Sequence, residues 1–226
     1  MAYRRPKAPA PRPAETTLIR RLVGIGFALT SRGDHRADLE ETLVHASELG
    51  MDDGDLRVLS ILTTWLEVHH RVVCVDRLRR LMTEHPSRRV RAYWAAVSSS
   101  ASFEGRFEPL AELGVCDSLD LLGSGTSFLL RRKGVDERFN DQVLRVARGT
   151  LRKRVADVAS PEQLARTHRG YALRVMLGSS YRAVLWEQLE RDSELTPSAA
   201  GRRARSSFST AWETVRDFRL IQGVGA

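Results

Sequence analysis

The sequence predicts a mainly α-helical protein with a little β-structure in the middle of the chain. Two patterns support this prediction. Apolar residues recur at helical spacing along most of the chain, and capping residues precede several of these stretches. At 226 residues, with 42% hydrophobic and 28% charged residues, the composition is that of one large or two small globular domains. No apolar run approaches the roughly 20 residues of a membrane span, so we expect a cytoplasmic protein that does not enter a membrane.

Four regions follow from composition and periodicity. Residues 1–14 are rich in proline, alanine and basic residues and predict a disordered arm. Residues 15–134 predict a helical domain, residues 135–160 a connector with a candidate strand at 143–147, and residues 161–226 a C-terminal domain. Within the helical domain, the periodic stretches are 16–29, 38–49, 55–70, 76–82 and 88–98. In the C-terminal domain, Ser160 is the expected N-cap of a helix that runs to Leu177.

The middle of the chain predicts a small β-hairpin. Asp117–Leu122 and Thr126–Leu130 have the composition of two strands, and a glycine turn joins them. Together with the helices before it, this hairpin predicts a winged-helix-like unit within residues 55–133, although another short helix is expected at 101–114. The basic residues after the second strand are candidates for phosphate contacts: Arg131, Arg132 and Lys133.

The C-terminal residues predict three short helices. The first covers Tyr181–Arg191 and is amphipathic. The second begins at Thr196, a good N-cap, with Pro197 at the first helical position, where a missing N–H has no cost. It ends near the polar turn at residues 205–207. The third has apolar residues at the spacing of one buried face: Phe208, Ala211, Trp212, Val215 and Phe218.

This segment resembles the helix-turn-helix domains of bacterial regulators. The resemblance implies that the last helix enters the DNA major groove with its N-terminal residues first. The implied base contacts are Ser206, Ser207, Ser209, Thr210 and Thr214. The implied phosphate contacts are Arg202, Arg203, Arg205 and Arg216, with Arg4, Arg5 and Lys7 of the arm as further candidates. Only residues 222–226 follow the last helix, which is too few for a wing hairpin in this module.

The distribution of charge agrees with a nucleic-acid partner. The net charge is +8, and the basic excess lies in residues 1–14 and 145–226, whereas residues 15–144 are slightly acidic. A localised basic excess is the electrostatic pattern of a protein that binds phosphates. We therefore expect a non-enzymatic protein that binds double-stranded DNA, either as a prokaryotic-type regulator or as the DNA-binding subunit of a larger system.

Two other interpretations of the C-terminal helices remain open. They could be a plain three-helix packing unit with a solvated basic face. They could also belong to a protein-interaction adaptor or an antitoxin-like complex subunit that binds a protein partner or forms a homodimer. Exposure of Trp212 and Phe218 would favour the adaptor, because aromatic residues and arginine dominate interface hot spots.

Signatures of catalysis, metal binding and cofactor binding were not found. The six histidines lack the HExxH and i, i+4 spacings of helical metal sites. The glycine stretch Gly123–Thr126 lacks the lysine of a phosphate-binding P-loop. Cys74 and Cys116 lie in apolar surroundings without CxxC spacing and are expected to be small core residues. We therefore predict no catalytic residues, no metal ligands and no cofactor.

Overall fold

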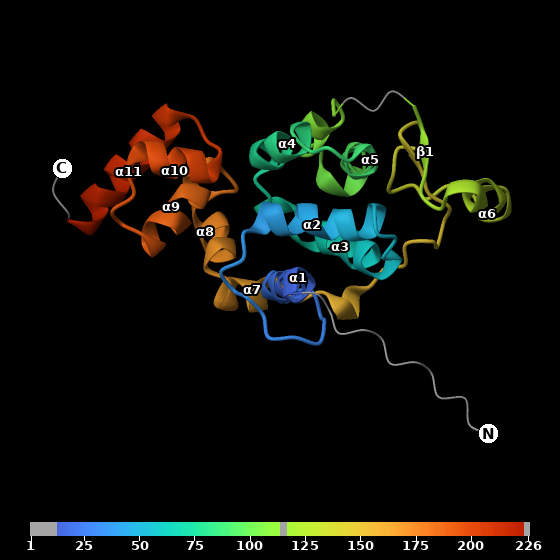
Figure 1. Ribbon diagram of the computed structural model, residues 1–226, viewed down its shortest axis with the longest axis horizontal. Coiled ribbons are helices and arrows are strands. Elements are labelled where there is room, and N and C mark those ends of the chain that lie inside the picture. Colours follow the sequence, from blue (N-terminus) through green and yellow to red (C-terminus); the bar gives the residue numbers. More distant parts are fainter. Residues whose placement is uncertain (1–12, 114–116, 224–226) are drawn as a thin grey trace, which may run out of the picture.

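The computed structural model describes residues 13–113 and 117–223, and it is mainly helical (Figure 1). In this part of the chain the α-helices are α1 (Pro13–Gly24), α2 (Leu39–Met51), α3 (Leu56–His69), α4 (Val75–Thr83), α5 (Arg88–Val97), α6 (Thr126–Lys133), α7 (Pro161–Thr167), α8 (Arg169–Leu177), α9 (Tyr181–Arg191), α10 (Pro197–Ala204) and α11 (Phe208–Gln222). Short 3₁₀ turns connect several of them. The predicted mainly α class is confirmed.

Helix starts are fixed by local side-chain hydrogen bonds. The side chains of Asp38, Asp55 and Ser87 accept backbone N–H groups at the starts of α2, α3 and α5. Ser160 and Thr196 cap α7 and α10 in the same way, as the sequence predicts. Such a cap satisfies one of the N–H groups that a helix start leaves without a partner.

Two hydrophobic clusters hold these helices. The larger lies among α1 to α5 and extends to α7 and α8; the smaller lies among α8 to α11. In the larger cluster, Trp65 is fully buried and its indole N–H donates to the carbonyl of Ile25 at 2.8 Å. Trp94 is equally buried and donates to the hydroxyl of Ser47 at 3.0 Å. These hydrogen bonds let two large aromatic rings fill the core without leaving a polar group unsatisfied.

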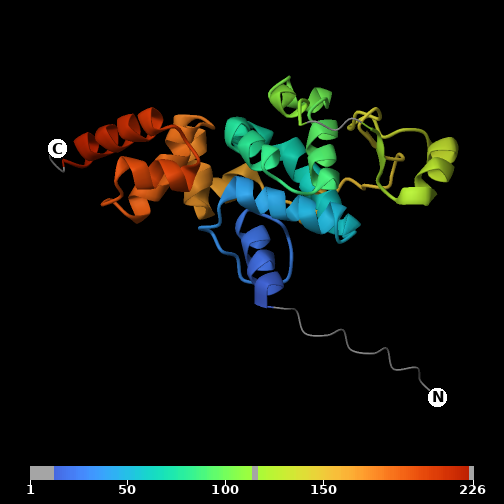
Figure 2. The same cartoon turned by 45° about the horizontal axis from the view of Figure 1, so that its top comes forward.

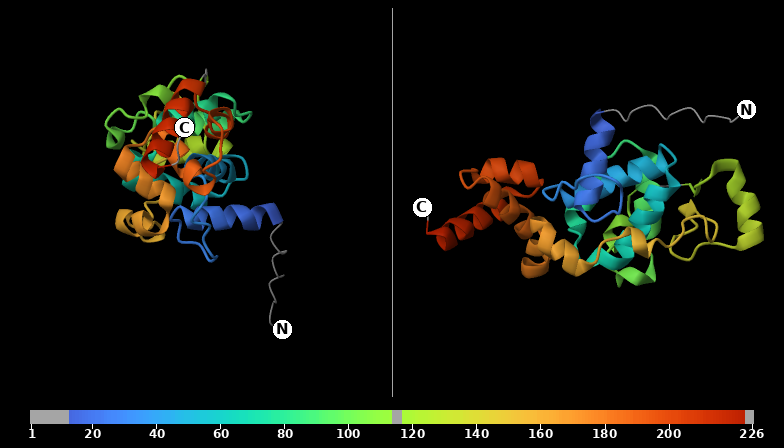
Figure 3. Two further views of the ribbon diagram at one scale, coloured as in Figure 1. Left: turned by 90° about the vertical axis from the view of Figure 1, so that its left-hand side faces the viewer. Right: turned by 90° about the horizontal axis from the view of Figure 1, so that it is seen from below.

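The molecule is elongated, and its two ends differ. Figures 1 and 2 show α11 at one end and α6 at the other, with α2 and α3 between them. Figure 3 shows the same separation from below and places α1 as a helix that projects from the side of the body. The C-terminal helices therefore lie far from the basic end of α6.

The predicted β-hairpin is wrong. Residues 126–130, expected as its second strand, lie in α6, whereas the short strand β1 (Leu119–Asp120) pairs in parallel with β2 (Leu144–Arg145). The apolar residues of 126–130 are adjacent rather than alternating, so they do not specify one face of a strand. A basic last turn also suits a helix C-terminus, whose dipole favours positive charge. The hairpin that would have formed the wing is thus not formed by these residues.

Two further expectations need adjustment. The single helix expected after Ser160 is divided at His168, which ends α7 and caps α8. The candidate strand at 143–147 contains β2, which is shorter.

Residues 13 and 14, assigned to the basic arm, begin α1. The predicted residues Arg4, Arg5, Lys7 and Cys116 lie outside the described residues. Cys74 is buried, as expected. None of the helices in the described ranges combines the length and the apolar character needed to cross a bilayer.

Candidate nucleic-acid interface

Helices α10 and α11 form a helix–turn–helix pair with a tight connection. Arg205 adopts a left-handed backbone conformation (φ 57°, ψ 33°), and its N–H donates to the carbonyls of Gly201 and Arg202. Ser207 then caps α11 by accepting the N–H of Thr210 at 3.2 Å. Three residues therefore stop one helix, reverse the chain and start the next.

Close packing between the two helices depends on Gly201. A β-carbon built at this position would lie 3.2 Å from the β-carbon of Ala211, a contact tighter than most real ones. Both residues are buried. The absence of a side chain at residue 201 thus allows α10 to approach the first turn of α11.

Enlarging Gly201 is expected to separate the helices. Gly201→Leu should lower the free energy of unfolding by about 1–3 kcal/mol, the usual cost of an overpacked core, measured by urea denaturation. Gly201→Ala is the matched control, because the gain of about 1 kcal/mol in helix propensity offsets its mild crowding. Equal stability of the leucine and alanine variants would show that the two helices do not pack in this way.

The buried face of α11 is narrower than the sequence predicts. Ala211, Val215 and Phe218 are buried, and the Phe218 ring packs edge-on against Trp186 with centroids 5.2 Å apart. Phe208 and Trp212, expected in the same apolar stripe, are instead 61% and 47% exposed. The neighbouring helices therefore cover only part of the predicted apolar stripe.

The residues predicted to contact bases are only partly accessible. Ser207 and Ser209 are exposed, and Ser206 and Thr210 are half-buried. Thr214 is buried, and its hydroxyl donates to the carbonyl of Thr210 at 2.7 Å. The prediction of a base contact from Thr214 is therefore wrong, because its side chain is buried and its hydroxyl is bonded within α11.

The predicted phosphate-contacting arginines are exposed but differ in their partners. Arg202 forms no side-chain hydrogen bond or ion pair with the described part of the chain. Arg203 forms a loose surface pair with Asp192 at 3.4 Å, and Arg205 pairs with Glu84, the residue that follows α4. Arg216 pairs with Asp217 and lies over the ring of Trp212, 5.3 Å from its centroid. Arg202 and Arg203 are thus the most readily available cations of the pair.

The other predicted phosphate contacts lie elsewhere. Arg131, Arg132 and Lys133 form the exposed last turn of α6, at the opposite end of the molecule from α11 (Figure 1). These two groups of basic residues cannot contact the same short stretch of DNA backbone. The α6 group is therefore not part of the interface formed by α10 and α11.

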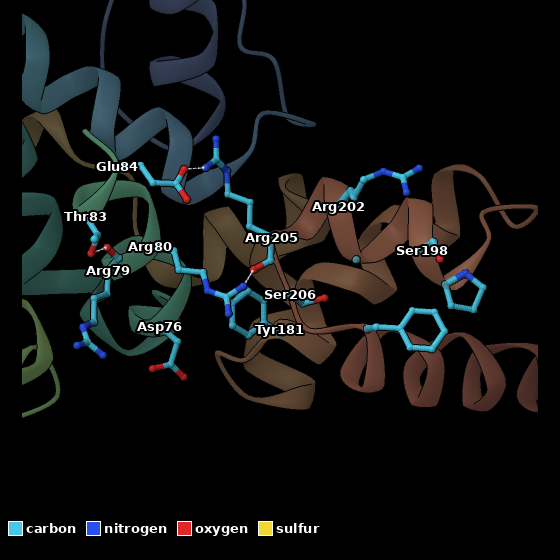
Figure 4. A pocket seen from close by; sticks show the side chains of 13 residues that line it. Asp76, Arg79, Arg80, Thr83, Glu84, Tyr181, Ser198, Arg202, Arg205 and Ser206 are labelled. Atoms are coloured by element: carbon cyan, nitrogen blue, oxygen red, sulfur yellow. Dashed lines mark hydrogen bonds and ion pairs between the residues drawn. The ribbon is translucent and has the colours of Figure 1, made fainter. Parts of the chain in front are cut away.

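An open pocket lies between α4 and α10, which we call the α4–α10 pocket. Its volume is about 830 Å³. Figure 4 shows the side chains around it, which come from α4 and the residue after it, α9, α10, the turn that follows α10, and the start of α11. It is lined by Asp76, Arg79, Arg80, Thr83, Glu84, Tyr181, Pro197, Ser198, Gly201, Arg202, Arg205, Ser206 and Phe208. Four arginines against two carboxylates make its lining cationic.

Helix α4 also holds the turn of the helix–turn–helix pair. Buried Arg77 donates through its Nε to the carbonyl of Ala204 at 3.2 Å, and Arg80 donates to the carbonyl of Arg205. These carbonyls end α10 and have no partner within that helix. The arginines of α4 were missed in the sequence, because nothing local shows that residues about 120 positions apart meet.

A buried ionic cluster lies at the same junction. The Oε2 atom of Glu40 accepts from Arg77 at 3.0 Å and from Arg174 at 2.9 Å, and its Oε1 atom accepts the N–H of Cys74 at 3.0 Å. Glu40, Arg77 and Arg174 are each at most 2% exposed. Burial alone would lower the pKa of Arg77, but the carboxylates of Asp38 and Glu40 outweigh burial and raise it. The cluster joins α2, α4 and α8, and Arg77 extends it to α10.

Two histidines are structural rather than exposed. The rings of His69 and His168 are buried and bond the carbonyls of Ala159 and Ala37. Among the described residues, no three His, Cys, Asp or Glu side chains are arranged to hold a metal ion. Comparison of the chain with protein-family models, with curated proteins and with solved structures finds no match.

Proposed function

We propose that this chain is a non-enzymatic protein that binds double-stranded DNA through α10 and α11, as a regulator or as a DNA-binding subunit of a larger system. One observation carries the proposal. The tightly connected helix pair exposes Arg202, which has no side-chain partner among the described residues, the loosely paired Arg203, and the hydroxyl of Ser209 in the first turn of α11. Phosphate contacts supply affinity, and polar side chains at the start of the second helix read base edges.

We propose different roles for the predicted residues. Arg202 and Arg203 contact phosphates. Ser209, exposed in the first turn of α11, is the proposed base-edge contact, and Arg216, on the same side of the helix but two turns later, stays a proposed phosphate contact. Ser207 is occupied as the cap of α11, so its contribution is to start the helix. A cytoplasmic location remains a prediction from the sequence.

A salt series tests this function. Binding of a labelled DNA duplex of about 30 base pairs should weaken steeply from about 50 to 200 mM salt, because bound cations on DNA are released when arginines replace them. The double variant Arg202→Ala/Arg203→Ala should reduce the slope of log K against log salt by about 1.8, since each phosphate contact contributes about 0.9. Fluorescence anisotropy measures both the affinity and the slope.

The end of α6 provides a charge-matched control. Arg131→Ala/Arg132→Ala removes the same charge from exposed side chains at the far end of the molecule. This variant should retain the salt slope of the unmodified protein. The same loss in both double variants would mean that net charge alone drives binding, and the proposed interface would be wrong.

A protein-interaction adaptor is the second candidate, and a specific observation favours it. Phe208, Trp212, Leu220 and Ile221 are all exposed on α11. Exposed aromatic residues beside arginine are typical of protein interfaces, although Phe218 is buried. An adaptor should show no measurable DNA binding at about 50 mM salt, the condition at which phosphate-driven affinity is strong.

A further inference from the structure

We infer that the α4–α10 pocket holds one strand of the phosphate backbone of bound DNA, contacted by Arg79 from α4 and Arg202 from α10. This inference rests on the proposed DNA binding and adds a part of the protein about 120 residues before the helix–turn–helix pair. The group that binds in the pocket is a phosphodiester of the DNA duplex.

The location of the pocket supports a backbone strand. Ser206 and Phe208 line the pocket, so it opens beside the first turn of α11 (Figure 4). In helix–turn–helix complexes the second helix enters the major groove while the first helix crosses the backbone. A strand that borders the groove entered by α11 would therefore lie along α10, and the pocket extends from α10 to α4.

The contacts of the four arginines separate those that hold the fold from those that are free to bind. Arg80 donates to the carbonyl of Arg205 and lies over the ring of Tyr181, 5.9 Å from its centroid. Arg205 itself pairs with Glu84. Both of these arginines fix the wall between α4 and α10.

The remaining two arginines are available to a ligand. Arg202 has no partner among the described residues. Arg79 has one ion pair, with Glu112 at 3.3 Å, and the two side chains are 50% and 77% exposed. A surface pair of this kind contributes about 0–1 kcal/mol, so a phosphate can replace Glu112 at little cost. Arg79 and Arg202 therefore provide one cation at each edge of the pocket, on α4 and on α10, where successive phosphates of one strand would pass (Figure 4).

Asp76 allows a test of opposite sign. It lines the pocket, is exposed, and forms no side-chain hydrogen bond or ion pair with the described residues. Its carboxylate would repel a phosphate held there. Removing this charge should strengthen DNA binding most if the backbone lies in the pocket, because the repulsion between two charges grows as they approach.

The experiment compares three variants of the full chain by fluorescence anisotropy with the duplex used above. Arg79→Ala should weaken binding roughly 5- to 10-fold near 100 mM salt and reduce the salt slope by about 0.9, as expected for one lost phosphate contact. Asp76→Asn should tighten binding. Arg148→Ala is the matched control, because it breaks a similar exposed pair, with Glu137, in the segment after β2. Its salt slope, like that of Arg131→Ala/Arg132→Ala, should equal the slope of the unmodified protein.

The outcomes distinguish this inference from the proposed function. If Arg202→Ala/Arg203→Ala reduces the slope while Arg79→Ala and Asp76→Asn bind like the unmodified protein, DNA binding stands and the pocket is not part of it. If the unmodified protein does not bind the duplex, both proposals fail. Inorganic pyrophosphate provides the last comparison. Suppose that micromolar pyrophosphate raises the melting temperature of the unmodified protein but not that of Arg79→Ala, and that Arg79→Ala binds DNA normally. The pocket would then bind a small anion, and the inference that it holds the DNA backbone would be wrong.

Discussion

Replacing Glu40 by alanine is expected to lower the free energy of unfolding by about 3–5 kcal/mol, the usual cost of removing one partner from a buried ionic cluster. The side chain of Glu40 is fully buried and accepts hydrogen bonds from Arg77 and Arg174. Without it, two buried guanidinium groups lose their shared carboxylate, and the N–H of Cys74 loses its acceptor. Urea denaturation at neutral pH measures the loss.

The loss of Glu40 should also loosen the turn of the helix–turn–helix pair. Arg77 also binds Asp38 at 2.5 Å and the carbonyl of Ala204 at the end of α10. When Glu40 is absent, Arg77 is held less firmly, and so is the carbonyl that it contacts. We therefore expect amide hydrogen exchange in the turn at residues 204–207 to be faster in Glu40→Ala at a urea concentration where the protein remains folded.

Glu41 provides the matched control. It is the next residue of α2 and contacts the same Arg77 at 3.2 Å, but its side chain is 39% exposed. Glu41→Ala should cost at most about 1 kcal/mol, because solvent replaces much of an exposed ion pair. Similar losses for the two variants would contradict the buried position of Glu40, and a small loss for Glu40→Ala would show that the arginines reach water.

Features encoded locally could be predicted from the sequence. Thr196 and Ser160 were identified as caps because their side chains bond to N–H groups only a few residues away. The periodic stretches of the chain correspond to helices for the same reason. The failed hairpin also has a local cause, since Thr126–Leu130 lacks the alternation of a half-buried strand and could only be assigned by its composition.

Features created by tertiary contacts could not be predicted. Periodicity shows that Phe208, Trp212 and Val215 lie near one another on a helix, but it does not show how wide a face the neighbouring helices cover. The interaction of α4 with the end of α10 is equally invisible, because it joins Arg77 to Ala204. A weak signal was present: Arg77 stands beside Leu78 and before Met82 on the apolar side of its helix, where a charged residue requires a partner.

Acidification is expected to destabilise the protein between about pH 6.5 and pH 4. His69 and His168 are buried, and burial lowers the pKa of each to about 4 despite hydrogen bonds to backbone carbonyls that favour the charged form. An unfolded histidine has a pKa of about 6.5. As the pH falls below 6.5, the unfolded state therefore binds protons that the folded state does not, and stability decreases. Full protonation of the unfolded state corresponds to about 3 kcal/mol for each histidine.

The geometry explains why the folded state requires neutral rings. The Nδ1 atom of His69 lies 2.9 Å from the hydroxyl of Tyr171, and the Nδ1 atom of His168 accepts the N–H of Tyr171 at 3.1 Å. In each ring Nε2 donates to a carbonyl, so Nδ1 of His168 must remain unprotonated to accept the N–H of Tyr171, and Nδ1 of a neutral His69 accepts from the hydroxyl of Tyr171. Glu162 favours protonation of His69, whereas Arg174 and Arg191 oppose protonation of His168. Protonation would thus remove both acceptors at the start of α8.

Urea denaturation at pH 7.5, 6.0, 5.0 and 4.5 measures this dependence, and a variant separates the histidines from the acids. His168→Asn keeps a residue that caps helices well but cannot titrate, so the loss between pH 7.5 and pH 4.5 should become clearly smaller, while His69 and His70, whose pKa values burial also lowers, keep their contributions. His35→Asn, at an exposed position, should leave the loss unchanged.

Asp38 contributes to stability in a different pH range. Burial opposes its ionisation, but Arg77 outweighs burial and lowers its pKa below 3.8, so its contribution to stability is lost only below about pH 4. A loss that begins only below pH 4 would therefore indicate Asp38 and would contradict the role of the two histidines.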